Sequence, residues 1–331
     1  MDRAEVMQLT KRTLVVVALA LLVLGGSGAA SGGRSGAATG SRGPFLWGAW
    51  IGRQFTGSEP PWNWKAVTDF EARNAGGKRL TAVHWGVRTA WGHSFNYWLG
   101  PLNRVRRAHA VSVMDMYSES VPLREIADGT YDAALRAWAS EARRWRHSFL
   151  LRFDWEMNGR WFPWGTKSTN QNTPADFVAA WRHMHDIFTS AGARNVRWVW
   201  CPNANRDNTE ASLSQLYPGR SYVDWTCLDG YNTGKPWLSF TKIFSRSYHL
   251  IRRLAPTKPM IIGEVASTEH NGSKARWISG MFRALATRFP HIRGLLWYDK
   301  YGSSGVTDWP IETSRTSSAA FSRGLALRLS R

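Results

Sequence analysis

The chain has 331 residues, of which 43% are hydrophobic and 20% charged, and its formal net charge at pH 7 is +19. Length and hydrophobic content are those of one large globular domain. The basic residues are spread along the chain and no DNA- or RNA-binding motif appears, so we expect no nucleic-acid partner and keep a basic nucleic-acid-binding protein as the weaker alternative. Attraction to an anionic cell surface or an acidic polysaccharide stays open.

The first 30 residues have the organisation of a signal peptide. Lys11 and Arg12 precede an apolar run, Thr13 to Leu24, and small residues follow as far as Ala30. The run is shorter than the ~20 residues of a membrane span. We therefore expect export with cleavage near Ala30 and a secreted, extracellular protein. An uncleaved signal anchor, holding the protein at the cell surface, is the alternative and the only expected membrane contact.

Residues 31–43 form a Gly/Ser/Ala spacer without core-forming side chains, which predicts a flexible linker before a single domain at 44–331. In that domain short apolar runs alternate with longer amphipathic stretches, a pattern typical of repeated strand–helix units. The predicted strands are Phe45–Ile51, Leu80–Trp85, Ala110–Tyr117, Ser148–Trp155, Val196–Cys201, Val223–Tyr231, Pro259–Glu264 and Gly294–Tyr298. The predicted helices are Trp62–Ala75, the weaker His93–Val105, Tyr131–Trp145, Thr173–Ala191, Phe240–Leu254, Lys274–Arg288 and Thr316–Leu329.

Eight such units without an internal linker predict an α/β fold, a closed (β/α)₈ TIM barrel. No glycine-rich phosphate loop follows the first strand, which counts against a nucleotide-binding open sheet. The two cysteines, Cys201 and Cys227, lie near the ends of predicted strands five and six. These strands would be neighbours in a barrel, so either a disulfide or two buried thiols fits the pattern.

Two glutamates end predicted strands, Glu156 on strand four and Glu264 on strand seven. In a parallel barrel both would lie at the C-terminal mouth, where catalytic residues are found. One carboxyl group that donates a proton and one that attacks the sugar are the equipment for breaking a glycosidic bond. Strand alternation would place Arg152, Asp154 and Glu156 on one face, with Arg152 holding a carboxylate ionised.

Further side chains near these strand ends are candidates for binding a sugar. Tyr231 could donate a hydrogen bond to Glu264 from the adjacent strand, and the indole faces of tryptophan suit the apolar face of a pyranose. We expect Trp297 to form a floor under the reacting sugar, and Trp161 and Trp164 to form walls or to pack their loop. The remaining candidates, each of which has a packing or turn-forming alternative, are His84, Asp115, Asn203 and Asn205.

Three segments resemble glycoside hydrolase family 26: the run Arg152 to Trp161, the run Tyr222 to Asn232 and the run Pro259 to Ser267. The family contains β-mannanases and some β-1,3-1,4-glucanases and β-1,3-xylanases, and the resemblance extends from about Phe45 to Tyr298. It implies a (β/α)₈ barrel and hydrolysis with retention of anomeric configuration.

By position in these motifs, the resemblance implies that Glu156 is the acid/base and Glu264 the nucleophile. It places Arg152 and Tyr231 as supports of the nucleophile, and Trp161 and Trp297 in the sugar subsites. Asn158, in the first motif, is also expected to contact the substrate.

One position departs from the family. Trp155 stands where the family has a histidine that contacts the sugar next to the cleavage point. An indole N–H donates a hydrogen bond but cannot accept one. This substitution does not change the prediction of a glycoside hydrolase, but it weakens the prediction that the preferred sugar is mannose.

The sequence therefore predicts a secreted, retaining glycoside hydrolase that acts on a β-linked polysaccharide or oligosaccharide, endo-β-1,4-mannanase first. A β-1,3-1,4-glucanase or β-1,3-xylanase is the alternative within the fold, and a catalytically silent glycan-binding barrel is the alternative outside enzymes. Endo or exo action stays open. We expect a monomer that needs no cofactor. We also expect no metal site, because His183 and His185 lie on a predicted helix and lack the spacing of metal ligands.

Overall fold

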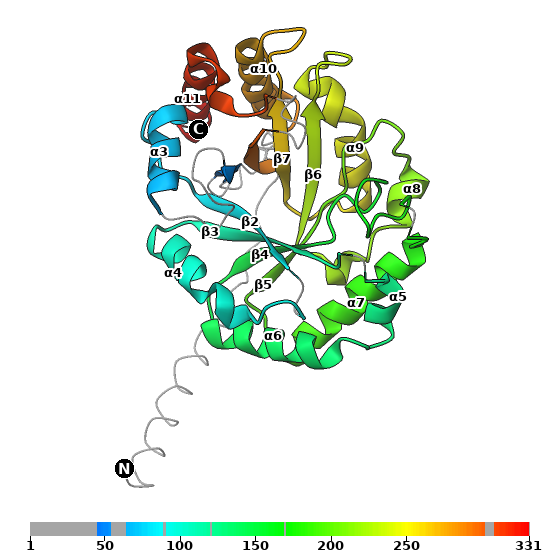
Figure 1. Cartoon of the computed structure of the whole chain (residues 1–331). Coiled ribbons are helices and arrows are strands. Elements are labelled where there is room, and N and C mark those ends of the chain that lie inside the picture. The colour runs from blue at the N-terminus through cyan, green and yellow to red at the C-terminus, as the bar shows by residue number, and fades with distance from the viewer. Residues whose placement is uncertain are drawn as a thin grey trace, which may run out of the picture. The chain divides into compact units, whose positions relative to one another are not determined.

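The computed structural model describes residues 45–53, 64–88, 91–119, 121–168, 170–301 and 308–330. The predicted signal peptide and spacer lie outside the described residues. The eight strands form a closed barrel in which each strand is parallel to its neighbours and strand order follows the sequence (Figure 1). The strands are β1 Leu46–Ile51, β2 Ala82–Arg88, β3 Val111–Tyr117, β4 Phe149–Phe153, β5 Val196–Trp200, β6 Trp225–Asn232, β7 Met260–Ser267 and β8 Ile292–Asp299.

Helices surround the barrel, so the predicted (β/α)₈ fold is confirmed. They are α3 Trp64–Asn74, α4 Leu99–Arg107, α5 Leu123–Ala127, α6 Asp132–Trp145, α7 Pro174–Ser190, α8 Glu210–Ser214, α9 Phe240–Leu254, α10 Lys274–Thr287 and α11 Arg315–Leu329. The predicted start of α7 is confirmed, because the Thr173 side chain accepts a hydrogen bond from the Asp176 backbone N–H and Pro174 occupies the first turn. The short helices α5 and α8 were not predicted, since five residues carry no helical period.

The barrel interior has a lower apolar layer and an upper polar layer. The apolar layer consists of Ala82, Val113, Leu150, Val199, Cys201, Cys227, Ile261 and Leu296. Two residues further along four of these strands, on the same face, lie the buried polar side chains of His84, Asp115, Arg152 and Asp229. The strands therefore carry the polar residues towards their carboxyl ends, the end of a barrel at which active sites are built.

Cys201, directly after β5, and Cys227, on β6, are joined in a disulfide with a Cα–Cα distance of 4.3 Å. Both belong to the apolar layer, so the bridge lies directly beneath the polar one. Among the described residues, no helix combines the length and the apolar character that crossing a bilayer would require.

Candidate active site

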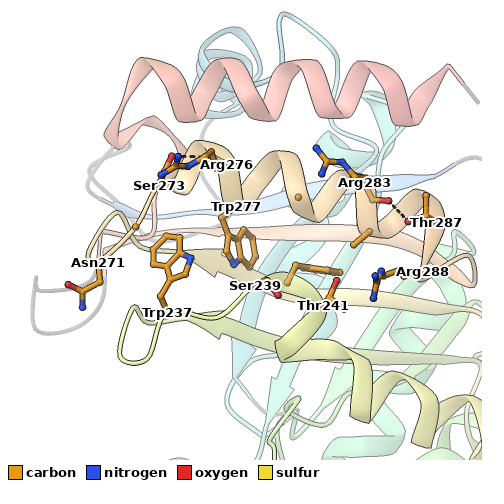
Figure 2. A pocket seen from close by; sticks show the side chains of 14 residues that line it. Trp237, Ser239, Thr241, Asn271, Ser273, Arg276, Trp277, Arg283, Thr287 and Arg288 are labelled. Carbon is orange, nitrogen blue, oxygen red and sulfur yellow. Dashed lines mark hydrogen bonds between the residues drawn. The ribbon is translucent and has the colours of Figure 1, made fainter.

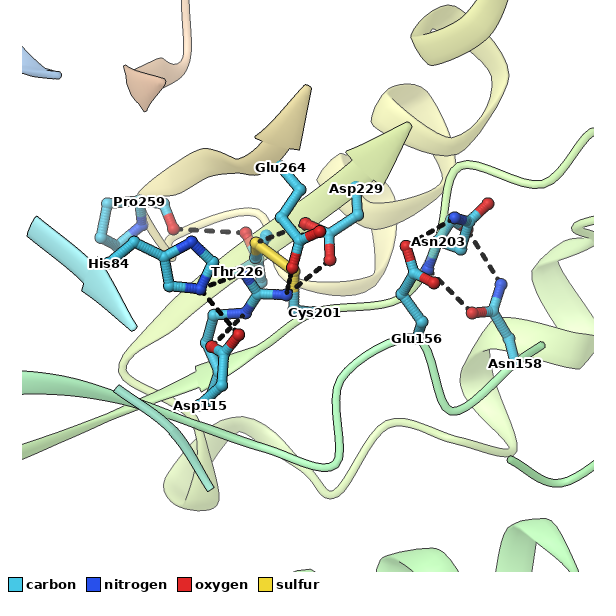
Figure 3. The surroundings of a disulfide bond; sticks show 12 residues. His84, Asp115, Glu156, Asn158, Cys201, Asn203, Thr226, Asp229, Pro259 and Glu264 are labelled. Carbon is cyan, nitrogen blue, oxygen red and sulfur yellow. Dashed lines mark hydrogen bonds and ion pairs between the residues drawn. A yellow bond between two sulfur atoms is a disulfide. The ribbon is translucent and has the colours of Figure 1, made fainter. Parts of the chain in front are cut away.

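A single buried guanidinium organises the polar layer. Arg152 Nε lies 3.2 Å from Asp115 Oδ1, and its Nη2 lies 2.5 Å from Asp229 Oδ2 and 3.1 Å from Glu264 Oε1. His84 Nε2 lies 2.7 Å from the second oxygen of Asp115. Figure 3 shows His84, Asp115, Asp229 and Glu264 grouped around this point. Arginine stays charged even when buried, so it offers these carboxylates a fixed positive charge.

Three carboxyl groups facing one cation cannot all ionise in a buried site without a large cost. Burial raises the pKa of Asp229 well above its usual range, although the neighbouring Arg152 lowers it. Asp229 therefore takes up a proton more readily than an ordinary aspartate does.

A β-bulge turns Glu264 into the barrel. Leu228 of β6 pairs with Ile262 of β7, and the next residue, Asp229, pairs with Glu264. Gly263 therefore has no partner on β6 and is the extra residue of the bulge. Without it, alternation from Ile261 would place residue 263 rather than Glu264 on the interior face. Gly263 has no room for a side chain, because a Cβ there would lie 2.4 Å from Cys227 Sγ and 2.9 Å from an Arg152 nitrogen. β7 also continues beyond Glu264 to Ser267, which corrects the prediction that Glu264 ends its strand.

The second oxygen of Glu264 accepts a hydrogen bond from the Tyr231 hydroxyl. Burial, followed by the charge of Glu264, raises the pKa of Tyr231 well above its usual value, so the phenol keeps its proton and remains a donor. The Tyr231 ring stacks on Trp309 at 4.7 Å and meets Tyr298 edge to face at 5.9 Å. The aromatic cluster thus fixes the direction of the phenol.

Glu156 is positioned by a sharp turn instead of by a strand. β4 ends at Phe153, and Asp154 and Glu156 have φ values of 42° and 54°. Left-handed backbone at non-glycine residues is uncommon and concentrates at functional sites. The predicted alternation of Arg152, Asp154 and Glu156 is therefore wrong: Asp154 accepts hydrogen bonds from the Ser118 backbone N–H and hydroxyl instead.

A backbone hydrogen bond ties this turn to the end of β5: the Glu156 N–H donates to the carbonyl of Cys201 at 2.7 Å. The Glu156 carboxyl accepts hydrogen bonds from Asn203 Nδ2 at 2.7 Å and from the Trp161 indole. Asn158 is buried and holds Asn203 by accepting from its backbone N–H at 2.8 Å and donating to its carbonyl at 2.9 Å. Figure 3 shows Glu156, Asn203 and Asn158 in this chain of contacts.

Burial and then the negative charge of Glu264 raise the pKa of Glu156 to about 7, although the bonds from Asn203 and Trp161 and the charge of Arg152 lower it. Near neutral pH, Glu156 therefore exists as a mixture of acid and carboxylate. A group in this state can both donate and accept a proton. The two glutamates are close enough for the charge of one to act on the other.

Several predicted substrate contacts occupy other places. Trp297 is completely buried, packs outward against Trp277 and Phe321, and donates its indole N–H to the carbonyl of Trp309, so it cannot be the floor under a sugar. Its neighbour Tyr298, half-buried, is the β8 residue beside Tyr231.

Trp164 is also buried, stacks on Phe162 and donates its indole N–H to the carbonyl of Trp155, so it packs its loop. His84 is buried within the Arg152 network, and Trp155 is half-buried beneath that loop, with Arg152 5.6 Å from its ring. Asn158 is buried, and its side-chain amide bonds to Asn203 and Asn208.

The remaining aromatic candidate, Trp161, is 48% exposed, donates its indole N–H to Glu156 and lines a hollow of about 390 Å³. This hollow, which we call the mouth pocket, is also lined by Asn203, Tyr231 and Leu238. The contact of Asn203 with Glu156 was not predicted from the sequence, and neither was the contact of Asp229 with Arg152. Asp229 lies two residues before Tyr231 on β6, so strand alternation could have identified it.

Two groups of side chains in the described part of the chain have metal-ligand spacing: Cys201, Cys227 and Asp229, and His84, Asp115 and Glu264. In the first the cysteines are joined to each other. In the second Arg152 contacts both carboxylates and would repel a cation. Neither group fits a metal ion.

Known proteins resemble this chain in both sequence and fold. The sequence profile of "Glycosyl hydrolase family 26" matches residues 125–278, which include both glutamates, Arg152 and Tyr231. Endoglucanase H of Acetivibrio thermocellus is 33% identical over 284 residues, 83% of this chain and 29% of that protein. Residues 125–278, which carry the candidate site, thus match glycosyl hydrolase family 26.

Two mannanases also match, one in sequence and one in fold. Mannan endo-1,4-beta-mannosidase A and B of Caldalkalibacillus mannanilyticus is 32% identical over 151 residues, 44% of this chain and 27% of that protein. The catalytic domain of an endo-beta-1,4-mannanase from Bacillus sp. JAMB-750 superimposes with a TM-score of 0.66 at 16% identity, over 86% of each chain. At that identity the superposition shows the shared fold. The chain spans less than a third of the length of the two curated relatives.

The proximity of the two glutamates gives a first testable prediction. In a Glu264→Gln variant the pKa of Glu156 should fall below about 7, because a negative charge that raises it is removed while its burial remains. Carbon-13 NMR titration of the glutamate carboxyl carbons measures this pKa. Asp186→Asn, which neutralises an exposed carboxylate on α7, is the control. An unchanged Glu156 pKa in Glu264→Gln would show that the two carboxyls do not interact.

Proposed function

We propose that this protein is a retaining family 26 glycoside hydrolase of β-linked polysaccharide, with Glu264 as nucleophile and Glu156 as acid/base. The observation that carries the proposal is the different environment of two neighbouring buried carboxyls. Glu264 is paired with Arg152 and Tyr231, which stabilise a carboxylate. No cation among the described residues forms an ion pair with Glu156, and its pKa is raised to about 7 by burial and by Glu264.

In the first step a Glu264 oxygen bonds to the anomeric carbon while the bond from that carbon to the leaving oxygen breaks. Glu156 gives its proton to the departing oxygen and becomes a carboxylate. The product is a covalent glycosyl-enzyme. Arg152 and Tyr231 remain on Glu264 and orient the attacking oxygen.

In the second step Glu156 removes a proton from water, whose oxygen bonds to the anomeric carbon as the bond to Glu264 breaks. Two inversions give net retention, and Glu156 recovers its proton. The hydrogen bonds from Asn203 and Trp161 suit this double role, since both stabilise the ionised form that follows the first step. Trp161, the exposed aromatic residue at the mouth pocket, would contact the sugar on the leaving side.

The first candidate substrate is β-1,4-mannan and the second is a β-glucan. Curated mannanases match about 44% of the chain, whereas the relative named as an endoglucanase matches 83% of it at a similar identity. Trp155 in place of the family's histidine also weakens the case for mannose. These two observations favour the β-glucan as the serious second candidate, with β-1,3-xylan third.

A substrate panel separates these candidates. On β-1,4-mannan, mixed-linkage β-glucan and β-1,3-xylan, we expect reducing ends to appear from one polymer at least about tenfold faster than from the others, as a specificity difference of 1–2 kcal/mol gives. Chromatography of the products shows whether they are long, as in endo action, or short. Release from none of the polymers would favour the glycan-binding barrel over an enzyme.

The two roles can be separated with azide and an aryl β-glycoside of the preferred sugar. Glu264→Ala should lower kcat by at least about a thousandfold, as loss of a nucleophile does. Azide should then attack from the vacated side and give a glycosyl azide of inverted configuration. With Glu156→Ala, azide should intercept the glycosyl-enzyme and give the retained configuration.

Asp186→Ala, which removes an exposed carboxylate, is the control and should retain full activity without an azide product. Circular dichroism establishes that each variant is folded. Exchange of the two azide configurations between the variants would reverse the roles of Glu156 and Glu264, and full activity of Glu264→Ala would remove the assignment.

We also propose that residues 1–30 direct export, residues 31–43 link them to the 44–331 domain, and the mature protein acts as a monomer. The Cys201–Cys227 bridge suits an oxidising compartment. Intact-mass spectrometry of protein recovered outside the cell should show loss of residues up to Ala30, and a further gain of about two hydrogen masses on reduction. A full-length mass in the membrane fraction would indicate the anchor instead.

A further inference from the structure

A second hollow lies outside the catalytic mouth, between the chain that follows β6 and helix α10. Its volume is about 720 Å³, and Figure 2 shows its labelled side chains, with Trp237 at one end and Arg288 at the other. We call it the arginine pocket and define it by Trp237, Arg276, Arg283 and Arg288. Two of the arginines lie two turns apart on α10, at 276 and 283, and so share a helix face.

Three connections hold the aromatic end of the arginine pocket in place. Gly272 lies flat against the Trp237 ring, since a Cβ on it would stand 2.5 Å from the ring atoms. Asn271 donates its side-chain N–H to the carbonyl of Gly234 at 3.0 Å, and Trp277 donates its indole N–H to the carbonyl of Leu238 at 2.7 Å. Half-buried and fixed in this way, Trp237 loses little conformational entropy when a ligand stacks on it.

The charge of the arginine pocket is uncompensated within the part of the chain that the structure describes. Arg276, Arg283 and Arg288 are exposed, and none of them forms an ion pair with another described residue. The adjoining hollow adds Arg315 and Arg323 on α11, also exposed and outside these ion pairs. Guanidinium groups without partners bind carboxylates by paired hydrogen bonds.

The arginine pocket and the mouth pocket share one stretch of chain, residues 233–239. Trp237 and Ser239 line the arginine pocket, while Thr233, Lys235 and Leu238 line the mouth pocket beside Tyr231. A polymer that enters the catalytic mouth can therefore have a neighbouring part within reach of Trp237. From Arg276 to Arg288 the helix rises about 18 Å, enough for several sugar units.

We propose that the arginine pocket is a second glycan site, which binds a uronate-bearing polysaccharide by stacking one sugar on Trp237 and pairing its carboxylates with the arginines of α10. An aromatic platform beside polar edges suits a sugar, and the arginines select an acidic one. This site goes beyond the proposed hydrolase function, which needs only the two glutamates of the mouth.

The test is isothermal titration of the full chain with a galacturonate hexamer at 50 mM salt. Arg276→Gln/Arg283→Gln/Arg288→Gln should weaken binding at least about tenfold, because charge-assisted hydrogen bonds are lost. The charge-matched control Arg106→Gln/Arg144→Gln/Arg194→Gln removes three exposed arginines that likewise form no ion pair with a described residue, and should change affinity less than about twofold. Trp237→Ala should weaken the hexamer several-fold.

Equal losses in the two triple variants would reduce the effect to overall charge and overturn the proposal, as would no binding by the native chain. Polyphosphate and duplex DNA are titrated alongside the hexamer. If either binds the native chain more tightly and Trp237→Ala leaves all three affinities unchanged, the pocket is a general anion surface and the proposal fails. Binding is measured without turnover, so its failure leaves the hydrolase proposal untouched.

Discussion

The buried guanidinium of Arg152 makes the contacts on which the candidate active site depends. It is the cation in contact with Asp115, Asp229 and Glu264, all almost inaccessible to solvent. Removing one partner of such a buried cluster typically costs about 3–5 kcal/mol, since the others keep uncompensated charge. The same contact that stabilises the fold therefore orients Glu264. Structure and reactivity cannot be separated at this point of the barrel.

Two local departures from regular strand geometry bring the glutamates to that site. A β-bulge at Gly263 rotates Glu264 inward, and a left-handed turn after β4 directs Glu156 towards Asn203. Both are tied to the disulfide, because Gly263 packs on Cys227 and the backbone of Glu156 bonds to the carbonyl of Cys201. The bridge thus fastens the supports of both carboxyls to the apolar layer of the barrel.

The regular parts of this molecule could be predicted from the sequence, and the irregular parts could not. Apolar runs alternating with amphipathic stretches predicted every strand, because buried parallel strands and surface helices impose those patterns. Alternation reveals which residues share a face but not which face is inside, and so Trp297 was placed at the mouth although Tyr298 is the inward residue. The alternation of side chains along a strand also does not reveal a β-bulge or the residue at which the strand ends. The orientations of Glu264 and Asp154 could therefore not be predicted from the sequence.

The structure shows where part of the strong positive charge of the chain lies. Spread along the sequence, the arginines resemble a general feature of composition. The fold, however, gathers four exposed arginines on α10 and α11, and a fifth, Arg288, directly after α10, around the two hollows that adjoin α10. Charges at such a surface interact over about 8–10 Å at physiological salt, so they act mainly on what lies in the pocket. A hydrolase that retains an acidic polymer there would keep neutral stretches of the same chain near its mouth, raising their local concentration without changing the chemistry at Glu264.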